Sequence, residues 1–231
     1  PPGSGLGTSS AAAVALIAGI ISFAGKEIDK KDIAEEAIRV ERIVLGQAGG
    51  YQDEYASAFG GFNYIEFLPG GVRNVIPLSL TSQFKDQLLS HLKLFFLGGE
   101  HSSGDQQQKL IQSMETNKDS VEALKELKNI TQKMKTALES QDLEGFGLLL
   151  HEGWELKKRL NKSISNSLID NYYNSAISLG AIGGKLLGAG GTGYLLLFIP
   201  PEKYDVVAKE MVRNGARELV FKFDEEGVVV T

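Results

Sequence analysis

The sequence predicts an α+β protein built from two domains. Helical spacing of apolar residues dominates residues 10–45 and 106–179, whereas apolar runs typical of strands occupy residues 62–78 and 88–97. Helices packed on mostly antiparallel strands define the α+β class. A chain of 231 residues is long enough for one large domain or two smaller ones with cores of their own.

Two helices are expected near the start of the chain. Residues 10–25 are apolar enough to form a core helix, and Asp29 is placed to cap a second helix that ends near Leu45. Asp29 and Asp32 have the spacing of a capping box with an acidic partner.

A glycine-rich loop and a hairpin follow these helices. The loop at residues 47–55 leads into a short helix that ends at Gly60-Gly61. Aromatic and polar residues alternate over residues 62–67, which predicts a strand, and residues 72–78 form its partner across Pro69-Gly70-Gly71.

The predicted domains cover residues 1–80 and 81–231, with the boundary near residues 79–86. The second domain is expected to begin with a strand at residues 88–97, a polar loop at 98–105 and a helical stretch at 106–179 with breaks near Asn117, Ser140 and Ser163. A glycine-rich segment at 180–193, a strand at 194–199, a helix after Pro201 and closing strands at 218–223 and 227–230 are expected to follow. Pro201 suits the first turn of its helix.

Charge and composition narrow the class of protein. The 24 basic and 29 acidic residues give a net charge of −5, which argues against a nucleic-acid-binding surface. The absence of cysteine excludes a disulfide framework and a thiolate zinc site. The most apolar stretch, residues 11–24, is too short to span a bilayer and lacks a basic flank. We therefore expect a cytoplasmic protein with neither a nucleic-acid nor a membrane partner.

The opening run of the chain suits phosphate binding. Glycines spaced two apart let the backbone turn its N–H groups inward, and the helix that follows adds unpaired N–H groups and a positive dipole end. The residues expected to bind phosphate are Gly3, Ser4, Gly5, Leu6, Gly7, Thr8, Ser9 and Ser10. The alternative is a turn that only caps the helix, with Ser9 or Ser10 as the N-cap.

The opening run fits neither of two common phosphate motifs. It lacks the lysine of a P-loop, since the first lysine of the chain is Lys26, and its glycines do not have the Rossmann spacing. The charge of a phosphate must therefore be neutralised by a metal or by residues elsewhere. The hydroxyl of Ser9 or Ser10 could bind such a metal.

Three motifs in order resemble those of the GHMP kinases. Residues 1–12 resemble the second conserved motif of that family, residues 41–55 its segment with a magnesium-binding glutamate and a catalytic aspartate, and residues 184–193 its third, glycine-rich motif. Further runs resemble D-glycero-D-manno-heptose 7-phosphate kinases, and fucokinases share parts of them. These runs are residues 51–56, 59–67, 151–158 and 180–191.

The resemblance implies a fold, a reaction and cofactors. The fold is a ribosomal-S5-like N-domain, expected here to lack its beginning, followed by a ferredoxin-like C-domain. The reaction is γ-phosphoryl transfer from ATP, with Mg²⁺, to the anomeric hydroxyl of a heptose 7-phosphate. A fucokinase-like or other hexose kinase and a non-catalytic ligand-binding relative are the alternatives. Sugar or sugar phosphate is thus the expected partner, and a homodimer is left open.

The resemblance also assigns roles to two acidic residues. Asp53 corresponds to the catalytic aspartate that orients or deprotonates the sugar hydroxyl; otherwise it caps a helix that begins at Glu54. Glu41, together with Ser10, corresponds to the metal site. The alternative for Glu41 is a solvated glutamate paired with Arg42 or Lys30.

The remaining expected site residues would bind the substrate. They are Gly188, Ala189, Gly190 and Gly191 in the third motif, and the cations Lys157, Lys158 and Lys185 for a sugar phosphate. The alternatives are a tight turn before the strand at residue 194 and a solvated helix face. His151 and Trp154 are candidates for the acceptor pocket, although a tryptophan packed in the core is the simpler expectation.

Overall fold

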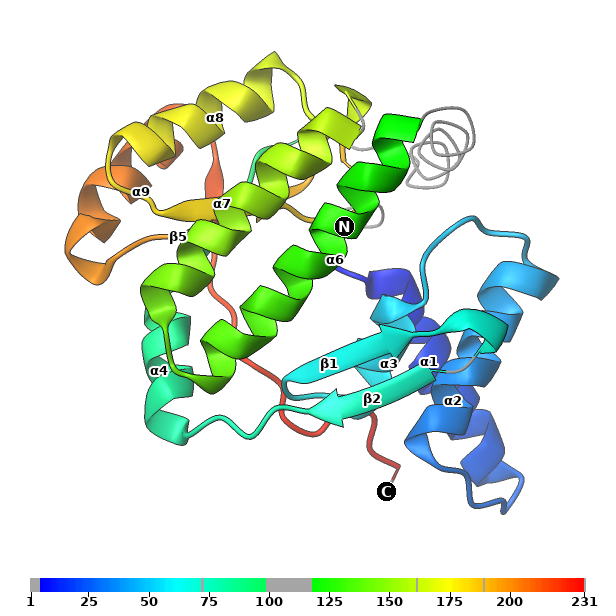
Figure 1. Cartoon of the computed structure of the whole chain (residues 1–231). Coiled ribbons are helices and arrows are strands. Elements are labelled where there is room, and N and C mark those ends of the chain that lie inside the picture. Colours follow the sequence, from blue (N-terminus) through cyan, green and yellow to red (C-terminus); the bar gives the residue numbers. More distant parts are fainter. Residues whose placement is uncertain (1–4, 72, 99–117, 161, 189, 231) are drawn as a thin grey trace. The chain divides into compact units, whose positions relative to one another are not determined.

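The computed structural model describes residues 5–71, 73–98, 118–160, 162–188 and 190–230 (Figure 1). Its contacts divide the chain into two compact units. One unit holds Gly7–Ser79 together with residues 223–230, and the other holds Gly5, Leu6 and Leu80–Lys222. Both units combine helices with antiparallel strands, so the predicted α+β class is confirmed.

The smaller unit packs three helices against a hairpin. The helices are α1 (Thr8–Phe23), α2 (Lys30–Ile38) and α3 (Gln52–Phe59). The hairpin strands, β1 (Asn63–Phe67) and β2 (Arg73–Pro77), are antiparallel, with Asn63 opposite Pro77 and Phe67 opposite Arg73. The helices lie behind the hairpin in Figure 1, and a buried cluster from α1, α2 and α3 meets Ile65 and Val75 of its strands. The predicted hairpin is therefore confirmed.

The residues at which α1 and α2 begin agree only in part with the starts predicted from the sequence. α1 begins at Thr8 rather than Ser10, because Gly7 provides the N-cap and no side chain caps this end. The alternative that Ser9 or Ser10 is the N-cap is therefore wrong. Asp29 does cap α2, since its carboxylate accepts a 2.8 Å hydrogen bond from the N–H of Asp32.

The second helix changes its hydrogen-bond pattern before it ends. After Ile38 it continues as a π-helix, η1 (Arg39–Val44), and the N–H of Leu45 bonds to the carbonyl of Val40 at 2.9 Å. The predicted end near Leu45 is correct, but the π turn was not predicted. Such turns are rare and frequently occur at functional sites.

The larger unit has an antiparallel sheet of four strands in the order β4-β5-β3-β6. The strands are β3 (Leu92–Phe96), β4 (Gly183–Leu186), β5 (Tyr194–Phe198) and β6 (Arg217–Leu219). Its helices are α4 (Ser82–His91), α6 (Lys118–Glu139), α7 (Leu143–Leu160), α8 (Ser167–Ser178) and α9 (Tyr204–Arg213). This strand order, with helices between β3 and β4 and between β5 and β6, is the ferredoxin-like arrangement that was expected.

Three predicted elements of this unit are corrected. Residues 88–91 belong to α4, capped by Thr81, so the strand predicted at 88–97 begins at Leu92. β4 lies inside the stretch predicted as a glycine-rich segment. Of the closing strands predicted at 218–223 and 227–230, only β6 is present and it ends at Leu219; residues 220–223 form no strand, and neither do the described residues 227–230, which belong to the smaller unit.

Two predicted helical breaks and the predicted position of Pro201 are confirmed. The helical breaks near Ser140 and Ser163 are present, and Pro201 opens a 3-10 turn, η4 (Pro201–Lys203), that leads into α9. The break near Asn117 and most of the loop predicted at 98–105 lie outside the described residues.

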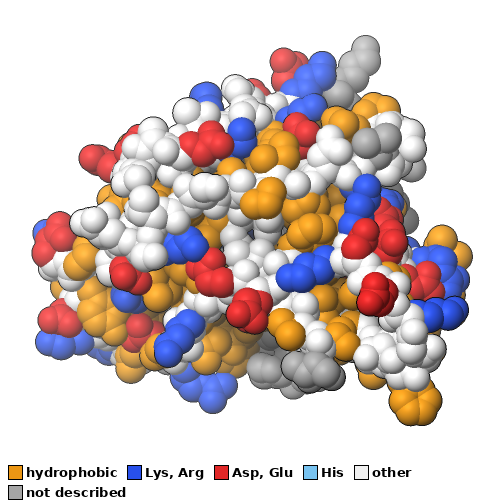
Figure 2. Space-filling view, turned by 90° about the horizontal axis from the view of Figure 1, so that it is seen from below, with side chains coloured by type: hydrophobic (Ala, Val, Ile, Leu, Met, Phe, Trp, Pro, Cys, Tyr) orange, Lys and Arg blue, Asp and Glu red, His pale blue; other side chains and the backbone are white. Residues whose placement is uncertain are grey.

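An apolar cluster of the larger unit packs residues of α7, α8 and α9 against strands of its sheet. Trp154 of α7, Phe95 of β3 and Leu195 of β5 are at most 1% exposed. Among the helices that the structure describes, none has both the length and the apolar character needed to cross a membrane. On the face shown in Figure 2, acidic and basic side chains are interspersed with apolar ones.

Candidate functional site

The N-terminus of α1 carries several of the residues expected to bind phosphate. Gly7 caps the helix with a left-handed φ of 66°, and Thr8, Ser9 and Ser10 form its first turn. The first N–H groups of a helix have no partner within it, and the helix dipole makes this end positive. No acidic side chain lies in the first turn to compete for an anion. This end of α1 is therefore suited to a phosphate group.

Ser9 and Ser10 both bind Glu41 of η1. The Ser9 hydroxyl donates to Glu41 Oε1 at 2.6 Å, and the Ser10 hydroxyl donates to Oε2 at 3.1 Å. Glu41 is only 2% exposed, so it is not the solvated glutamate of the alternative, although Arg42, one of the two partners considered for it, does lie 3.9 Å from its Oε2. Lys30, the other partner considered for it, instead binds the carbonyl of Glu226.

Glu41 remains ionised despite its burial. Burial alone would raise the pKa of its carboxyl group. The neighbouring Glu54 carboxyl, the two serine hydroxyls and the Arg42 guanidinium outweigh this effect, so the pKa of Glu41 is lowered. The first turn of α1 thus faces a fixed negative charge.

Asp53 lies beside the cap of the same helix. It is an exposed residue in the first turn of α3, and a Cβ atom added to Gly7 would lie 3.5 Å from its Cβ and Cγ atoms. The N-cap of α3 is Tyr51, and no side chain caps it, so the alternative that Asp53 serves as a cap is wrong. The structure therefore brings Gly7, Ser9, Ser10, Glu41 and Asp53 together.

The donor atoms at this point fit a magnesium ion. One ionised carboxylate and two hydroxyls are hard oxygen ligands of the kind that Mg²⁺ prefers. The described residues contain no cluster of three or more His, Cys, Asp or Glu side chains able to hold a metal. Mg²⁺ commonly binds one or two protein carboxylates and completes its shell with water and substrate phosphates.

Arg42, one of the partners considered for Glu41, and Glu54, which was not predicted, complete the surroundings of Glu41. Glu54 is fully buried beside Asp53 in α3, and its Oε1 accepts a 2.6 Å bond from Arg42. Its Oε2 has no hydrogen-bond partner. Burial and the neighbouring Glu41 raise the pKa of Glu54 to about 7. Nothing in the apolar spacing of α3 distinguishes this buried acid from the solvated acids of other helices.

The third glycine-rich motif lies in the larger unit, where it touches Gly5. A Cβ atom on Gly5 would lie 2.6 Å from the carbonyl oxygen of Leu187, and one on Gly188 would lie 2.5 Å from the Cα atom of Gly5. Gly188 and Gly190 have φ values of 78° and 105°. Bare backbone is required at these contacts. Gly3, Ser4 and Ala189 lie outside the described residues.

The predicted cations lie on α7 and β4 of the larger unit. Lys157 and Lys185 are half-buried. The ammonium group of Lys158 lies 2.8 Å from Glu155 and 3.7 Å from Asp170, so two carboxylates already balance its charge.

The aromatic candidates near these lysines differ in their surroundings. Trp154 is 1% exposed, as expected for a packed tryptophan. His151 Nδ1 lies 2.8 Å from the Tyr173 hydroxyl, and the two rings stack.

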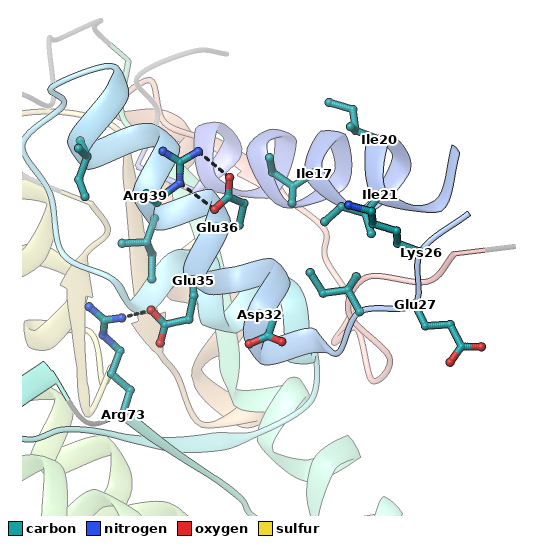
Figure 3. A pocket seen from close by; sticks show the side chains of 13 residues that line it. Ile17, Ile20, Ile21, Lys26, Glu27, Asp32, Glu35, Glu36, Arg39 and Arg73 are labelled. Atoms are coloured by element: carbon teal, nitrogen blue, oxygen red, sulfur yellow. Dashed lines mark hydrogen bonds and ion pairs between the residues drawn. The ribbon is translucent and has the colours of Figure 1, made fainter. Parts of the chain in front are cut away.

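A groove of about 810 Å³ opens elsewhere on the smaller unit (Figure 3). Isoleucines of α1 line one side of it, and charged residues of α2, η1 and β2 line the other. Its arginines are already paired, Arg39 with Glu36 and Arg73 with Glu35. None of the predicted site residues lines this groove, so its size alone does not make it the active site.

Comparisons with known proteins point to one family. A family model described as the GHMP kinases N terminal domain matches residues 1–61, and one described as GHMP kinases C terminal matches residues 134–217. The chain is 32% identical over 228 residues to the D-glycero-alpha-D-manno-heptose 7-phosphate kinase of Campylobacter jejuni, a match that covers 99% of this chain and 67% of that protein.

Two solved structures agree with this match. A D-glycero-D-manno-heptose 1-phosphate kinase from Bacteroides thetaiotaomicron is 30% identical with a TM-score of 0.73, over 98% of this chain and 63% of that one. A Campylobacter jejuni structure described as a sugar kinase is 30% identical with a TM-score of 0.77, over 98% of this chain and 65% of that one. The chain thus spans about two thirds of the length of these relatives.

Proposed function

Because the chain belongs to the GHMP kinases, we propose that it forms the phosphoryl-transfer centre of an ATP-dependent sugar kinase. The proposed acceptor is the anomeric hydroxyl of D-glycero-D-manno-heptose 7-phosphate. The observation that carries the proposal is the convergence of Ser9, Ser10, Glu41 and Asp53 at the N-terminus of α1. The name of the Campylobacter jejuni relative supports the heptose 7-phosphate, and the name of the Bacteroides thetaiotaomicron structure supports a heptose in general.

The proposed roles follow from the chemistry of phosphoryl transfer. The N–H groups in the first turn of α1 would bind phosphate oxygens of ATP, where the helix dipole favours negative charge. Glu41 and Ser10 would hold Mg²⁺, which when bound neutralises charge on the β- and γ-phosphates. Asp53 would orient the anomeric hydroxyl and take its proton as the sugar oxygen bonds to the γ-phosphorus and the bond to the ADP oxygen breaks.

The substrate side of the proposal involves the larger unit. The glycine-rich turn that includes Gly188, Gly190 and Gly191 would bind acceptor or phosphate through backbone N–H groups. Lys157, Lys158 and Lys185 are proposed to attract the 7-phosphate, and Lys158 could do so only by exchanging its carboxylate partners. Alanine at Lys157 or Lys185 should raise the KM of a phosphorylated acceptor without the same effect on ATP.

An acceptor screen tests the proposal. The full-length protein that contains this sequence is incubated with ATP and Mg²⁺ and with heptose 7-phosphate, the unphosphorylated heptose or L-fucose, and the products are followed by ³¹P NMR. We expect a second phosphate on the heptose 7-phosphate, together with ADP. Preferential phosphorylation of fucose, or of the heptose without its 7-phosphate, would overturn the proposed acceptor. Lack of transfer to any of the three sugars would overturn the kinase proposal for these sugars.

A further inference from the structure

Arg42 joins three separate segments around the candidate site. It lies in η1, directly after Glu41, and its guanidinium donates to the Gly50 carbonyl from Nη2 at 2.7 Å and from Nε at 3.2 Å. The same Nη2 donates to Glu54 of α3 at 2.6 Å, and Nη1 lies 3.9 Å from Glu41 Oε2. One side chain thus links the π-helix, the loop before α3 and α3 itself.

The loop is shaped to receive this guanidinium. A Cβ atom on Gly49 would lie 2.8 Å from both the Cζ and Nη2 atoms of Arg42. A contact that short would displace the guanidinium or the loop, so the planar group packs on bare backbone. The Arg42 side chain is 16% exposed and that of Glu54 is 0% exposed, so water screens this ion pair only weakly.

Arg42 contacts Glu41 directly, at 3.9 Å, and approaches Asp53 only through Glu54, the next residue of α3. Glu41 precedes Arg42 in η1, and Asp53 precedes Glu54 in α3. The ion pair between Arg42 and Glu54 therefore fixes the distance between the segment that carries Glu41 and the segment that carries Asp53. The π turn, which inserts an extra residue into the helix, is the local feature from which both Glu41 and Arg42 extend.

We infer that Arg42 is a positioning residue for phosphoryl transfer, holding Glu41 and Asp53 in register through its bonds to Gly50 and Glu54. The inference rests on the proposed function. Lysine cannot replace arginine here, because a point charge does not reproduce a planar fork that binds a carbonyl and a carboxylate together.

The experiment separates positioning from simple stabilisation. Arg42→Met leaves Glu54 as a buried, unpaired carboxylate, which destabilises the protein for that reason alone. The double variant R42M/E54Q removes the charge from both sides and keeps their volumes. Arg39→Met is the matched control, since Arg39 lies in the same π-helix but pairs with Glu36 at a solvent-exposed position.

Two readouts are measured on each full-length variant once its thermal unfolding shows that it is folded. One is the affinity for Mn²⁺ in the presence of ADP, from the electron paramagnetic resonance signal of free Mn²⁺. The other is kcat and KM for the sugar acceptor. We expect R42M/E54Q to lose roughly ten- to hundredfold in Mn²⁺ affinity and in kcat, with a KM within about threefold of the original. Arg42→Lys should recover stability but only part of kcat, and Arg39→Met should match the original protein.

The contrary outcomes are distinct. A folded R42M/E54Q variant with unchanged Mn²⁺ affinity and kcat would show that Arg42 only stabilises the fold, and would overturn the inference. Failure of the original protein to phosphorylate a heptose would overturn the proposed function. The Mn²⁺ affinities of R42M/E54Q and the original protein would still show whether Arg42 positions Glu41. Absence of Mn²⁺ binding by the original protein with ADP would overturn both.

Discussion

Ser9 and Glu41 are joined by a 2.6 Å hydrogen bond between the first turn of α1 and the π-helix η1. The bond fixes a buried carboxylate at the positive end of a helix before any ligand arrives. Ser10 engages the second oxygen of the same carboxylate at 3.1 Å, so both oxygens of Glu41 are held in place. A metal at this point would meet oxygen ligands that need little rearrangement.

Replacing Glu41 with Gln should raise the Mg²⁺ requirement. The amide keeps the size of the side chain but removes the negative charge that an Mg²⁺ ion would bind. We expect the Mg²⁺ concentration for half-maximal activity to rise roughly tenfold or more. Glu27→Gln, a change at an exposed position of the same unit, is the control. An unchanged Mg²⁺ titration for Glu41→Gln would remove Glu41 from the metal site.

Replacing Asp53 with Asn should lower kcat and leave nucleotide affinity nearly unchanged. The amide can still accept a hydrogen bond but cannot take a proton, so we expect kcat to fall by about 10²-fold or more. The measurement pairs steady-state kinetics with ADP binding by calorimetry. Asp86→Asn, at an exposed position in α4, serves as the control. Turnover close to that of the control would rule out the role assigned to Asp53.

Glu54 should make stability depend on pH in the sense opposite to an acid whose pKa is lowered on folding, because burial outweighs its pairing with Arg42. Its pKa is about 7 in the folded chain against 4.5 for the free group, so the folded state holds this proton more tightly. The resulting stabilisation is complete below pH 4.5 and disappears as the pH rises through about 7.

Comparison with Glu54→Gln isolates this effect. Between pH 4.5 and 8, the free energy of unfolding of the original protein should fall relative to the variant by at most about 3 kcal/mol. Urea unfolding at several pH values measures the difference. A difference that stays constant over this range would show that Glu54 keeps an ordinary pKa.

Gly60 is expected to be the least replaceable glycine at the end of α3. Its φ is 65°, and a Cβ atom would lie 2.1 Å from the backbone nitrogen of Gly227. Gly70 has a similar φ of 78° but open space around it, so it is a matched control for conformational strain alone.

The two alanine variants separate strain from collision. Gly70→Ala should cost about 1–2 kcal/mol from its left-handed backbone, and Gly60→Ala should cost clearly more because backbone atoms must also move. Thermal and urea unfolding measure both. Equal losses for the two variants would mean that the contact with Gly227 is easily relieved.

The sequence was sufficient to predict the elements whose signals are local. The Asp29 cap, the hairpin and the apolar strand β5 depend on residues close together in the chain. The candidate site residues came from motif resemblance, since no periodicity relates Ser9, Glu41 and Asp53.

The features that were missed depend on packing between distant segments. β4 was not predicted because glycines, which are weak strand formers, begin it. Glycine is needed there because α7 packs closely against the strand, and a Cβ atom on Gly183 would lie 2.1 Å from the Gly147 carbonyl oxygen. The apolar run that begins at Leu88 predicts a strand, yet Leu88 is buried together with Phe84 at helical spacing in α4. The π turn and the burial of Glu54 arise from contacts between η1, α3 and their neighbours, which leave no trace in local composition.

A crystal structure of the full-length protein with Mg²⁺ and a non-hydrolysable ATP analogue tests the central claim most directly. We expect the metal on Glu41 and Ser10, the phosphates at the N-terminus of α1, and the γ-phosphate within reach of Asp53. Phosphates bound away from this helix end, or a metal that touches neither Glu41 nor Ser10, would contradict it.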